Sequence, residues 1–487
     1  MRGGIKKIMK VLFAVSEAYP FVKSGGLGDV GGSLPQALQT EGTEVRVIIP
    51  KYTVIPEEYL RQMHRVTEFE VNLAWRRISC SIDRLEHQGI VYYFIGNDYY
   101  FNRESLYGYH DEGERFAFFS KAVLESLVYL NYQADVIHCH DWHTAIIPLM
   151  LKENFGNNPY YFGIKTILTI HNLKYQGYVP QIYFDDVLGF GGHRVAWEKL
   201  EYGDSLNYLK AGILSADLIT TVSPTYAQEI QQPSFGESLD SFLRKRKGDL
   251  YGILNGIDTV KYDPQRDPHL LINYRSSLAK KGENKKHLQG LMNLPSQGDW
   301  PLIAIVSRLV EHKGLDLVVH ILDELLNMNV QMVVLGTGDQ RFKEIFQHFA
   351  KQYPQKLAIR LFYDEALAHK IYGGADLLLM PSQSEPCGLS QMIAMRYGTL
   401  PIVRETGGLR DTVTPFNEAS VEGNGFSFVN YNAHDLLFTV QKAVKLFFED
   451  KTTWQGLVKN ARNSDFSWGK SARQYRDLYQ SILNKRI

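Results

Sequence analysis

Lys23-Ser24-Gly25-Gly26-Leu27-Gly28-Asp29-Val30 is a glycine-rich turn between an apolar strand, Lys10–Val15, and an amphipathic run that ends near Thr40. Its glycines remove side chains where the backbone must bend or approach a ligand closely. The amides that open the following helix can face an anion, and phosphate is the natural candidate. Lys23 adds a cation before the turn, and Asp29 adds an acceptor after it. The turn is neither a Walker loop nor a dinucleotide fingerprint, so an ordinary strand-to-helix turn stays open.

Short apolar runs alternate with helical patterns through the first half of the chain. The predicted strands are Val11–Val15, Val45–Ile49, Val91–Ile95, Val136–His140, Thr166–Ile170 and Leu218–Val222. Apolar strands separated by helices predict a parallel sheet covered on both faces, and hence a Rossmann-like domain. A polar insert from Asn97 to Glu114 has no clear period and is expected to be a mobile binding loop.

The alternation breaks between Tyr251 and Pro301 and then restarts. The strands predicted after the break are Leu302–Val306, Gln331–Leu335, Leu357–Phe362, Leu377–Met380 and Leu400–Val403. The sequence therefore predicts an α/β protein with two Rossmann-like, doubly wound domains that face a deep cleft, where ligands meet the carboxyl ends of the strands. We expect domains over residues 1–254 and 255–465, followed by a C-terminal helix over 466–487.

Composition excludes several classes of protein. Lys plus Arg and Asp plus Glu both number 53 in the 487 residues, so net charge gives no overall attraction to nucleic acid or to a membrane surface. The three cysteines, Cys80, Cys139 and Cys387, are widely spaced, which indicates a reducing compartment and a cytoplasmic protein. Met1–Val15 has too short an apolar core for a signal peptide, and no apolar run could span a bilayer.

Two cations follow the first strand of the second domain. Arg308 comes directly after Leu302–Val306, and Lys313 precedes Gly314 one turn later. A guanidinium and an ammonium at this spacing can both reach a diphosphate, one as a planar fork and the other as a point charge. A solvated pair of surface cations is the alternative, and the strand context favours the diphosphate.

A carboxylate lies at the end of another strand of this domain. Glu385 follows Leu377–Met380 and precedes Pro386 and a Gly-Leu-Ser sequence that opens a helix. Glu385 can hold ribose or sugar hydroxyls while the helix amides hold phosphate. Cys387 is most simply a small buried group, and the turn Gly336-Thr337-Gly338-Asp339 carries little weight by itself.

Histidines gather at the strand ends of the first domain, in His138-Cys139-His140-Asp141-Trp142-His143 and in Ile170-His171-Asn172. Successive strand residues point to opposite faces, so Cys139 points away from the face that His138 and His140 share. This disfavours a metal site. Asp141 and His171, at strand carboxyl ends, are expected to hydrogen-bond a sugar.

Taken together, these segments resemble the bacterial glycogen synthase and plant starch synthase family over nearly the whole chain. The motifs that carry the resemblance are Lys23–Val30, His140-Asp141-Trp142-His143, His171-Asn172-Leu173, Asn255-Gly256-Ile257-Asp258, Ser307-Arg308-Leu309 with Lys313-Gly314, and Glu385-Pro386-Cys387-Gly388-Leu389. The resemblance implies a GT-B fold and transfer of glucose from ADP-glucose to the non-reducing end of an α-1,4-glucan, glycogen or maltooligosaccharide, with retention of configuration. It also implies that the C-terminal helix over 466–487 returns to the first domain, and it implies neither a cofactor nor a metal.

The resemblance also assigns roles to residues. Lys23, Arg308 and Lys313 would contact the donor's diphosphate; His171, Asn255 and Glu385 would surround the glucose; Tyr363 would stack on the base and Asp141 would lie toward the acceptor. The other substrate-binding residues that we expect are Gly25, Gly26, Asp29, Cys387, Gly388, Leu389 and Ser390. The wider superfamily has a second glutamate where this chain has Ile393, which supports the narrower family.

Alternatives remain open on the sequence alone. A glucosyltransferase that uses UDP-glucose differs only in the base, and the absence of a regulatory amino-terminal extension favours ADP. A phosphorylase would need pyridoxal phosphate, yet no lysine has a recognisable context for it. A non-catalytic glucan-binding protein would also explain the 29 tyrosines, but the cations and Glu385 argue against it. The sequence gives no expectation for oligomeric state.

Overall fold

The computed structural model describes residues 8–297 and 299–484. The chain forms two compact units. Unit 1 comprises Met1–Gly256 and Trp468–Ile487, and unit 2 comprises Ile257–Ser467. The first seven residues of the segment Met1–Val15 and the last three of the helix expected over 466–487 lie outside the described residues.

Unit 1 is built on a nine-stranded sheet in the order β12-β11-β7-β6-β1-β2-β5-β4-β3. Its strands are β1 Lys10–Ala14, β2 Glu44–Pro50, β3 His64–Leu73, β4 Arg76–His87, β5 Ile90–Gly96, β6 Val136–His140, β7 Lys165–Ile170, β11 Leu218–Thr221 and β12 Leu250–Gly252. The strands from β12 to β5 are parallel, and β1 lies between β2 and β6. The winding therefore reverses between β1 and β6, where ligands of such sheets bind.

The sheet of unit 1 is not parallel throughout, contrary to the prediction. β3 and β4 form an antiparallel hairpin, and β4 pairs antiparallel with β5. Exposed and buried residues alternate along β3, as expected for a strand with one solvated face. A search for fully apolar runs misses such strands. A second antiparallel sheet, β8-β10-β9, was also missed; its strands are β8 Tyr178–Pro180, β9 Glu201–Tyr202 and β10 Ser205–Asn207.

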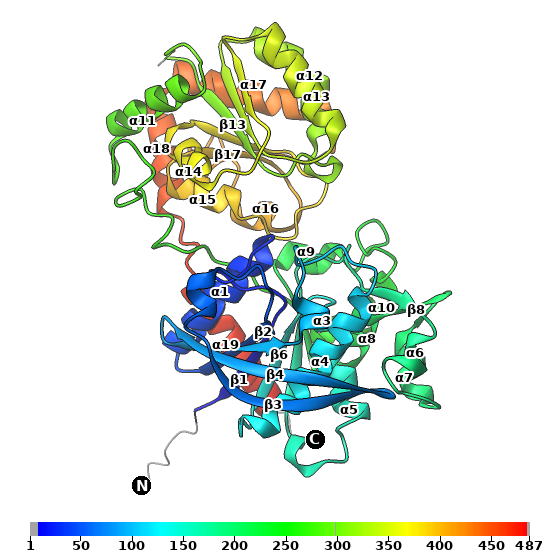
Figure 1. Cartoon of the computed structure of the whole chain (residues 1–487). Coiled ribbons are helices and arrows are strands. Elements are labelled where there is room, and N and C mark those ends of the chain that lie inside the picture. The colour runs from blue at the N-terminus through cyan, green and yellow to red at the C-terminus, as the bar shows by residue number, and fades with distance from the viewer. Residues whose placement is uncertain (1–7, 298, 485–487) are drawn as a thin grey trace, which may run out of the picture. The chain divides into compact units, whose positions relative to one another are not determined.

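Helices cover the sheet of unit 1 and connect its parallel strands (Figure 1). They are α1 Gly26–Thr40, α2 Glu57–Leu60, α3 Asp98–Phe101, α4 Glu112–Tyr129, α5 Ile147–Glu153, α6 Tyr183–Asp186, α7 Arg194–Leu200, α8 Tyr208–Ser215, α9 Pro224–Glu229, α10 Asp240–Lys245 and α19 Trp468–Asn484, with short 3₁₀ turns η1 Pro159–Tyr161 and η2 Lys247–Asp249. α19 packs on α1, although more than 400 residues separate them, so the last helix completes the unit that the first strand begins.

The insert from Asn97 to Glu114 is more ordered than its sequence indicated. It contains α3 and the first turn of α4, and Asn97 caps α3 by accepting from the amide of Tyr100 at 3.1 Å. Arg115 is fully buried and donates to the carbonyl oxygens of Tyr100 at 2.8 Å and Leu106 at 3.3 Å. Residues 102–111 have no regular secondary structure, as the sequence indicated, but a buried arginine just beyond the insert anchors its backbone. That the insert is a mobile binding loop stays a prediction.

Unit 2 contains one six-stranded parallel sheet in the order β15-β14-β13-β16-β17-β18. Its strands are β13 Leu302–Val306, β14 Gln331–Leu335, β15 Leu357–Arg360, β16 Leu377–Met380, β17 Leu400–Arg404 and β18 Phe426–Phe428. Numbered within the unit, this is the Rossmann order 3-2-1-4-5-6, with its reversal between β13 and β16. β15 ends two residues before the predicted Phe362, which is exposed.

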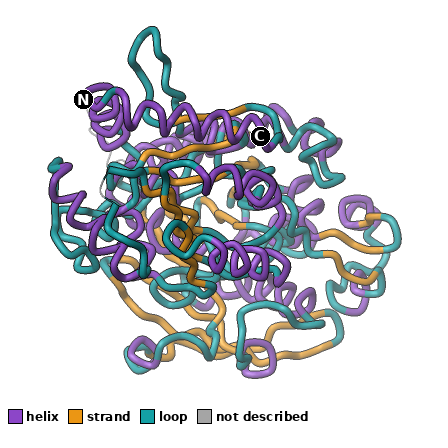
Figure 2. The backbone as a smooth tube through the Cα atoms, turned by 90° about the horizontal axis from the view of Figure 1, so that it is seen from above, coloured by secondary structure: helices purple, strands orange, loops and turns teal. Residues whose placement is uncertain are grey.

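The helices of unit 2 lie on both faces of its sheet: α12, α13 and α17 on one side, and α11, α14 and α15 on the other (Figure 1). They are α11 Leu278–Leu291, α12 Leu315–Asn327, α13 Gln340–Gln352, α14 Glu365–Gly374, α15 Ser390–Arg396, α16 Gly407–Thr412, α17 Ala433–Glu449 and α18 Lys451–Asn463, with the 3₁₀ turn η3 Glu311–Lys313. Figure 2 distinguishes helices, strands and the loops that join them. No helix within the described residues is long and apolar enough to cross a bilayer.

Candidate functional site

Many of the predicted site residues lie at the two places where the winding of a sheet reverses, whereas His171, Asn255 and Tyr363 follow other strands. In unit 1 the glycine-rich turn follows β1, and Asp141 follows β6, its neighbour. In unit 2 Arg308 follows β13, and Glu385 follows β16, its neighbour. Since parallel strands end at the same sheet edge, the residues after β1 and β6 lie at one edge of the sheet in unit 1, and those after β13 and β16 lie at one edge in unit 2.

The glycine-rich turn of unit 1 is held by a residue that the sequence analysis overlooked. Glu17, three residues beyond β1, is buried and accepts hydrogen bonds from the amide and the hydroxyl of Ser24, the latter at 2.9 Å. The hydroxyl of Tyr107 donates to the same carboxylate at 3.2 Å. Burial raises the pKa of Glu17, although these hydrogen bonds act in the opposite direction. Glu17 therefore fixes the turn through its backbone.

Lys23 and the start of α1 remain accessible. Lys23 Nζ contacts Asp29 Oδ1 at 2.7 Å, and about a quarter of each side chain is exposed. Gly25, the residue before α1, has nothing within 4 Å of the place where a Cβ would stand, and no side chain caps the helix. The backbone N–H of Gly25 interacts with the Glu17 carboxylate, and the anion contact expected of Gly25 and Gly26 stays a prediction.

Asp141 and His171 come together at the carboxyl ends of β6 and β7. Asp141 Oδ1 accepts from the amides of His171 at 2.7 Å and of Asn172 at 3.4 Å. Asp141 has a φ of 55°, an uncommon value for a residue with a side chain, and these bonds hold it there. Burial raises the pKa of Asp141 to about 7. One carboxylate oxygen thus orders the His171 loop.

The histidines of this region bond to protein groups. His138 hydrogen-bonds Thr169 Oγ1 through Nε2 at 2.6 Å and the Tyr479 hydroxyl through Nδ1 at 2.7 Å. His140 Nδ1 lies 2.9 Å from His171 Nε2. Burial lowers the pKa of His171 to about 3 and those of His138 and His140 well below their usual value. All three rings are therefore neutral at pH 7.

Asn255 and Tyr363, the two predicted residues that follow edge strands, differ in burial. Asn255, in unit 1, is buried, and its Oδ1 has no hydrogen-bond partner among the described residues. A buried polar atom without a partner is uncommon and favours a ligand at this position. Tyr363, in unit 2, lies in the loop after β15, and 73% of it is exposed, which leaves a ring face for a base to stack on.

In unit 2 the loop that carries Arg308 rests on the turn after β14. The amide of Leu309 donates to the carbonyl of Thr337 at 2.9 Å, and the amide of Asp339 donates to the carbonyl of Leu309 at 2.8 Å. A Cβ on Gly336 would lie 1.8 Å from the carbonyl oxygen of Ser307, so only glycine fits there. The turn Gly336-Thr337-Gly338-Asp339 therefore supports the backbone on both sides of Arg308. The side chain of Arg308 is exposed and has no ion pair among the described residues.

Lys313 and Glu385 meet across the reversal point of unit 2. Lys313 Nζ lies 2.6 Å from Glu385 Oε2, which also accepts from Ser382 Oγ at 3.0 Å. Gly314, with a φ of 71°, brings the two loops into contact, because a Cβ there would lie 2.0 Å from the carbonyl oxygen of Pro381. A cation and a carboxylate are thus held side by side at one sheet edge.

The segment after Glu385 is packed tightly. Gly388 has a φ of 73°, and its carbonyl accepts from Gln391 Nε2 at 2.9 Å. Cys387 is buried, in agreement with its expected role as a small core group. Leu389 immediately precedes α15, and Ser390 Oγ, at the start of that helix, accepts from the Tyr372 hydroxyl at 3.2 Å. These residues lie beside Glu385 in the sequence and shape the backbone that follows it.

Three potential metal ligands lie close together elsewhere in unit 2. Ligand atoms of Asp267, His269 and His369 are all within 4.8 Å of one another. Asp267 accepts from the His369 ring at 2.7 Å, from the Tyr397 hydroxyl at 2.5 Å and from the amide of His269 at 2.9 Å. Burial acts to raise the pKa of Asp267, but these hydrogen bonds hold it below its usual value. The carboxylate thus anchors the segment before α11.

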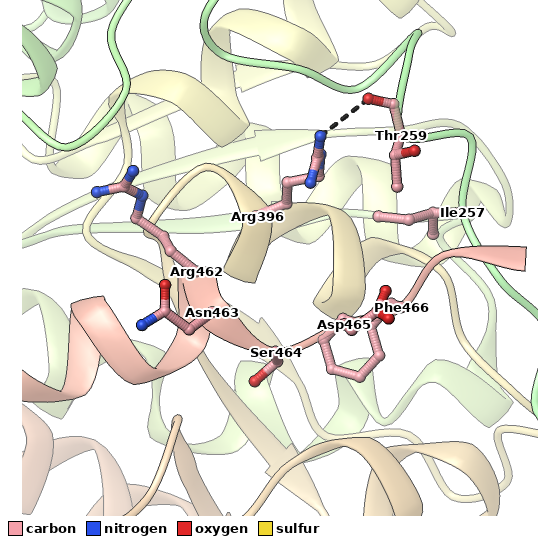
Figure 3. Close-up of a pocket in the computed structure, with 8 residues that line it drawn as sticks. All are labelled: Ile257, Thr259, Arg396, Arg462, Asn463, Ser464, Asp465 and Phe466. Atoms are coloured by element: carbon pink, nitrogen blue, oxygen red, sulfur yellow. Dashed lines mark hydrogen bonds between the residues drawn. The ribbon is translucent and has the colours of Figure 1, made fainter. Parts of the chain in front are cut away.

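A cavity of about 180 Å³ lies within unit 2, near the beginning and the end of that unit. Figure 3 shows its lining, in which Arg396 donates to the carbonyl of Thr259 at 2.9 Å. The other lining residues are Ile257, Arg462, Asn463, Ser464, Asp465 and Phe466. No predicted site residue lines this cavity, so it is separate from the candidate site.

Two residues of the candidate site were missed, Glu17 and Tyr107, whereas His140 was noted in a motif but given no role. Glu17 could have been found, because it lies just after the carboxyl end of β1, beside the reversal point. Tyr107 could not, because only the folded insert brings its hydroxyl to Glu17 and to Ser16 Oγ, the latter at 2.8 Å.

Two units with Rossmann strand order, each with polar groups at its reversal point, define a two-domain glycosyltransferase of the GT-B class. Comparison with known proteins agrees. Residues 10–245 match the family model "Starch synthase catalytic domain", and residues 293–464 match "Glycosyl transferases group 1". The catalytic domain of starch synthase IV from Arabidopsis thaliana, solved with ADP and acarbose, is 33% identical with a TM-score of 0.91, covering 98% of this chain and 100% of that one.

Curated relatives are closer in sequence. Glycogen synthase from Desulfitobacterium hafniense is 53% identical over 97% of this chain and 99% of its own length. Glycogen synthase from Desulforamulus reducens is 50% identical over 98% of this chain and 99% of its own length. The chain belongs to the glycogen synthase family. The predictions of a GT-B fold and of a hexosyltransferase are thereby confirmed.

Proposed function

We propose that this glycogen synthase family member transfers glucose from ADP-glucose to the non-reducing end of an α-1,4-glucan, with retention of configuration. The observation that carries the proposal is the Lys313–Glu385 pair, with its 2.6 Å contact at the reversal point of unit 2. A cation and a carboxylate side by side suit a ligand that has both phosphate and sugar hydroxyls. The ADP in the Arabidopsis starch synthase structure supports adenine as the base.

Three cations stabilise the leaving group in this proposal. Breaking the bond between C1 and the phosphate oxygen builds negative charge on ADP. In this proposal Lys23, Arg308 and Lys313 stabilise that charge. Arg308 is exposed and unpaired among the described residues, and so its guanidinium is ready for a diphosphate without losing a protein contact. The amides at Gly25 and Gly26 are assigned to the same anion.

The neutral and acidic groups are assigned to sugar and base. His171, Asn255 and Glu385 surround the transferred glucose, Asp141 lies toward the acceptor, and Tyr363 stacks on adenine. The unpartnered Oδ1 of Asn255 supports its assignment, because a sugar hydroxyl would satisfy it. The remaining assigned residues are Asp29, Cys387, Gly388, Leu389 and Ser390, which border these groups in the sequence.

The proposed chemistry takes place on one face of the sugar. The bond from C1 to the phosphate oxygen breaks, and a bond from C1 to the acceptor oxygen forms on the same face. The acceptor hydroxyl gives its proton to the departing phosphate, so charge and atoms balance without a protein nucleophile. Double displacement would instead need two carboxylates about 5–5.5 Å apart. Mass spectrometric detection of a glucosyl-protein adduct would contradict the same-face route.

Side-by-side kinetics test the function. Purified protein is incubated with maltooligosaccharide and either ADP-glucose or UDP-glucose, and chain elongation and nucleotide release are measured. We expect one glucose to be added per nucleotide released, and a higher kcat/KM with ADP-glucose. Higher efficiency with UDP-glucose would overturn the donor assignment, and no elongation with either donor would overturn the activity.

A further inference from the structure

His140 contacts His171 without itself being among the residues assigned to the substrate. Nδ1 of His140, the last residue of β6, lies 2.9 Å from Nε2 of His171, the residue after β7. His140 is fully buried, whereas His171 is half-buried at the sheet edge. The inner ring therefore faces only protein, and the outer ring faces both the protein and the space outside it.

The His140 ring is held firmly in place. It lies against the Phe13 ring, with centroids 4.0 Å apart, and against the His138 ring, with centroids 4.1 Å apart. The backbone of His140 is fixed as well, because its carbonyl accepts from Thr144 Oγ1 at 2.9 Å. A ring held by two aromatic neighbours presents Nδ1 in one direction only.

The contact between the two rings requires one proton. Burial keeps both imidazoles neutral, so one nitrogen of the pair donates and the other accepts. The remaining ring nitrogen of His140, Nε2, is buried without a partner among the described residues. If His140 carried its proton on Nε2, a buried N–H would lack an acceptor, which is rarer than a buried acceptor without a donor. The proton therefore belongs on Nδ1 of His140.

This arrangement determines the tautomer of His171. Nε2 of His171 accepts the hydrogen bond, so the proton of the neutral ring is on its Nδ1, which has no partner among the described residues. We propose that His140 is a positioning residue: it fixes the orientation and tautomer of His171 so that His171 Nδ1–H can donate a hydrogen bond to the donor sugar. The sugar contact rests on the proposed function, whereas the tautomer does not.

The tautomer is measured on the ligand-free wild-type protein. Histidine labelled with ¹⁵N is incorporated, and the ring signals of His171 are assigned by their loss in His171→Gln. We expect a one-bond N–H coupling at Nδ1 and an unprotonated Nε2. A proton on Nε2 of His171 would overturn the proposal. Because no substrate is present, this result is independent of whether the protein elongates a glucan.

Kinetics separate positioning from packing. In His140→Asn the amide NH₂ can occupy the place of Nδ1, so we expect kcat within about 3-fold of wild type. In His140→Leu the donor is lost, and we expect kcat to fall at least about 10-fold while the KM for donor changes less than about 3-fold. Equal losses in the Asn and Leu variants would overturn the assignment.

Phe13→Leu is the matched control. Phe13 packs on the His140 ring and makes no hydrogen bond to His171 through its apolar side chain, and leucine keeps an apolar group in its place. We expect its kcat within about 3-fold of wild type, and thermal unfolding of all three variants identifies any that do not fold. A loss in Phe13→Leu as large as that in His140→Leu would assign the effect to packing and overturn the proposal.

Discussion

The reversal points of the two units share a topology and differ in chemistry. In unit 1 the point between β1 and β6 is surrounded by buried neutral histidines and by Glu17 and Asp141, carboxyl groups whose pKa values are raised by burial. In unit 2 the point between β13 and β16 has the exposed Arg308 and the Lys313–Glu385 pair. The same strand order thus supports mainly buried histidines and carboxyl groups in unit 1, with the Lys23–Asp29 pair beside them, and mainly charged groups in unit 2.

This difference suggests a division of labour. Buried hydrogen-bonding groups favour a sugar whose hydroxyls point toward them, because a hydrogen bond that is left unmade in a low-dielectric site costs free energy. Exposed cations select phosphate by charge. We therefore expect the buried groups of unit 1, together with Glu385, to govern the position of the sugar, and the cations Arg308 and Lys313 of unit 2, together with Lys23, to govern the departure of the nucleotide.

The largest expected effect comes from the cations of unit 2. Arg308→Ala and Lys313→Ala should each lower kcat/KM for ADP-glucose by about 10²–10³, the usual loss when one preorganised group for transition-state charge is removed. Binding of maltooligosaccharide should not change. Arg341→Ala, on the exposed side of α13, is the control and should match wild type. Equal losses of turnover and glucan binding would contradict a diphosphate role.

The next comparison uses one glycine from each reversal point. Gly314→Ala should lower the free energy of unfolding by about 1–3 kcal/mol, because a Cβ would clash with Pro381 at a φ of 71°. Gly25→Ala should leave it within about 0.5 kcal/mol, because nothing lies within 4 Å of its Cβ position. Chemical denaturation measures both. A similar cost at both sites would show that the loops are equally constrained.

A third prediction tests the buried carboxyl of unit 1. The pKa of Asp141 is about 7 when folded and about 3.9 when unfolded, so between these values the folded protein holds a proton that the unfolded chain lacks. Its contribution to stability is therefore fully present below about pH 4 and decreases toward pH 7, by at most about 1.4 kcal/mol per pH unit.

Asp141→Asn should flatten this slope, because the amide oxygen can still accept from the loop amides but does not titrate. Chemical denaturation of the wild type and of Asp141→Asn between pH 4 and 8 measures the slope of the free energy of unfolding against pH. Any contribution of Glu17 is common to both proteins. An unchanged slope in Asp141→Asn would mean that Asp141 is already ionised in the folded protein.

The last comparison concerns the hydrogen bond between α19 and His138. Tyr479→Phe removes the hydroxyl 2.7 Å from His138 Nδ1 and leaves a buried nitrogen without its partner, which costs about 1–3 kcal/mol. Tyr353→Phe is the control in unit 2, since its hydroxyl bonds the exposed Asp323, and should change stability by less than about 0.5 kcal/mol. Thermal unfolding distinguishes them, and equal small changes would show that the His138 layer is not tightly coupled to α19.

The parallel strands of the core were predictable from the sequence because a strand buried on both faces is a continuous run of apolar residues. Strands such as Val136–His140 and Gln331–Leu335 were predicted with the bounds that the structure has. The hairpin β3–β4 was missed because a strand with one solvated face has no continuous apolar run. A strand as short as β18, with three residues, is too short to show a recognisable hydrophobic pattern.

The site was predictable where it depends on strand ends, and not where it depends on folding of distant segments. Arg308, Lys313 and Glu385 were placed beside a sheet edge by their positions after strands. The contact of Tyr107 with Glu17 joins residues 90 positions apart, and that of Tyr479 with His138 joins residues 341 apart. No local pattern indicates such pairs, because they depend on how the helices pack.

The return of α19 to unit 1 has a consequence for the order in which the chain folds. Unit 2 is continuous from Ile257 to Ser467, so a ribosome completes it before Trp468 is made. Unit 1 begins first, yet its sheet lacks the buried Tyr475 and Tyr479 until the last helix emerges. During synthesis the second unit can therefore reach its native state while the first is still incomplete, with apolar surface on α1 that a chaperone could protect.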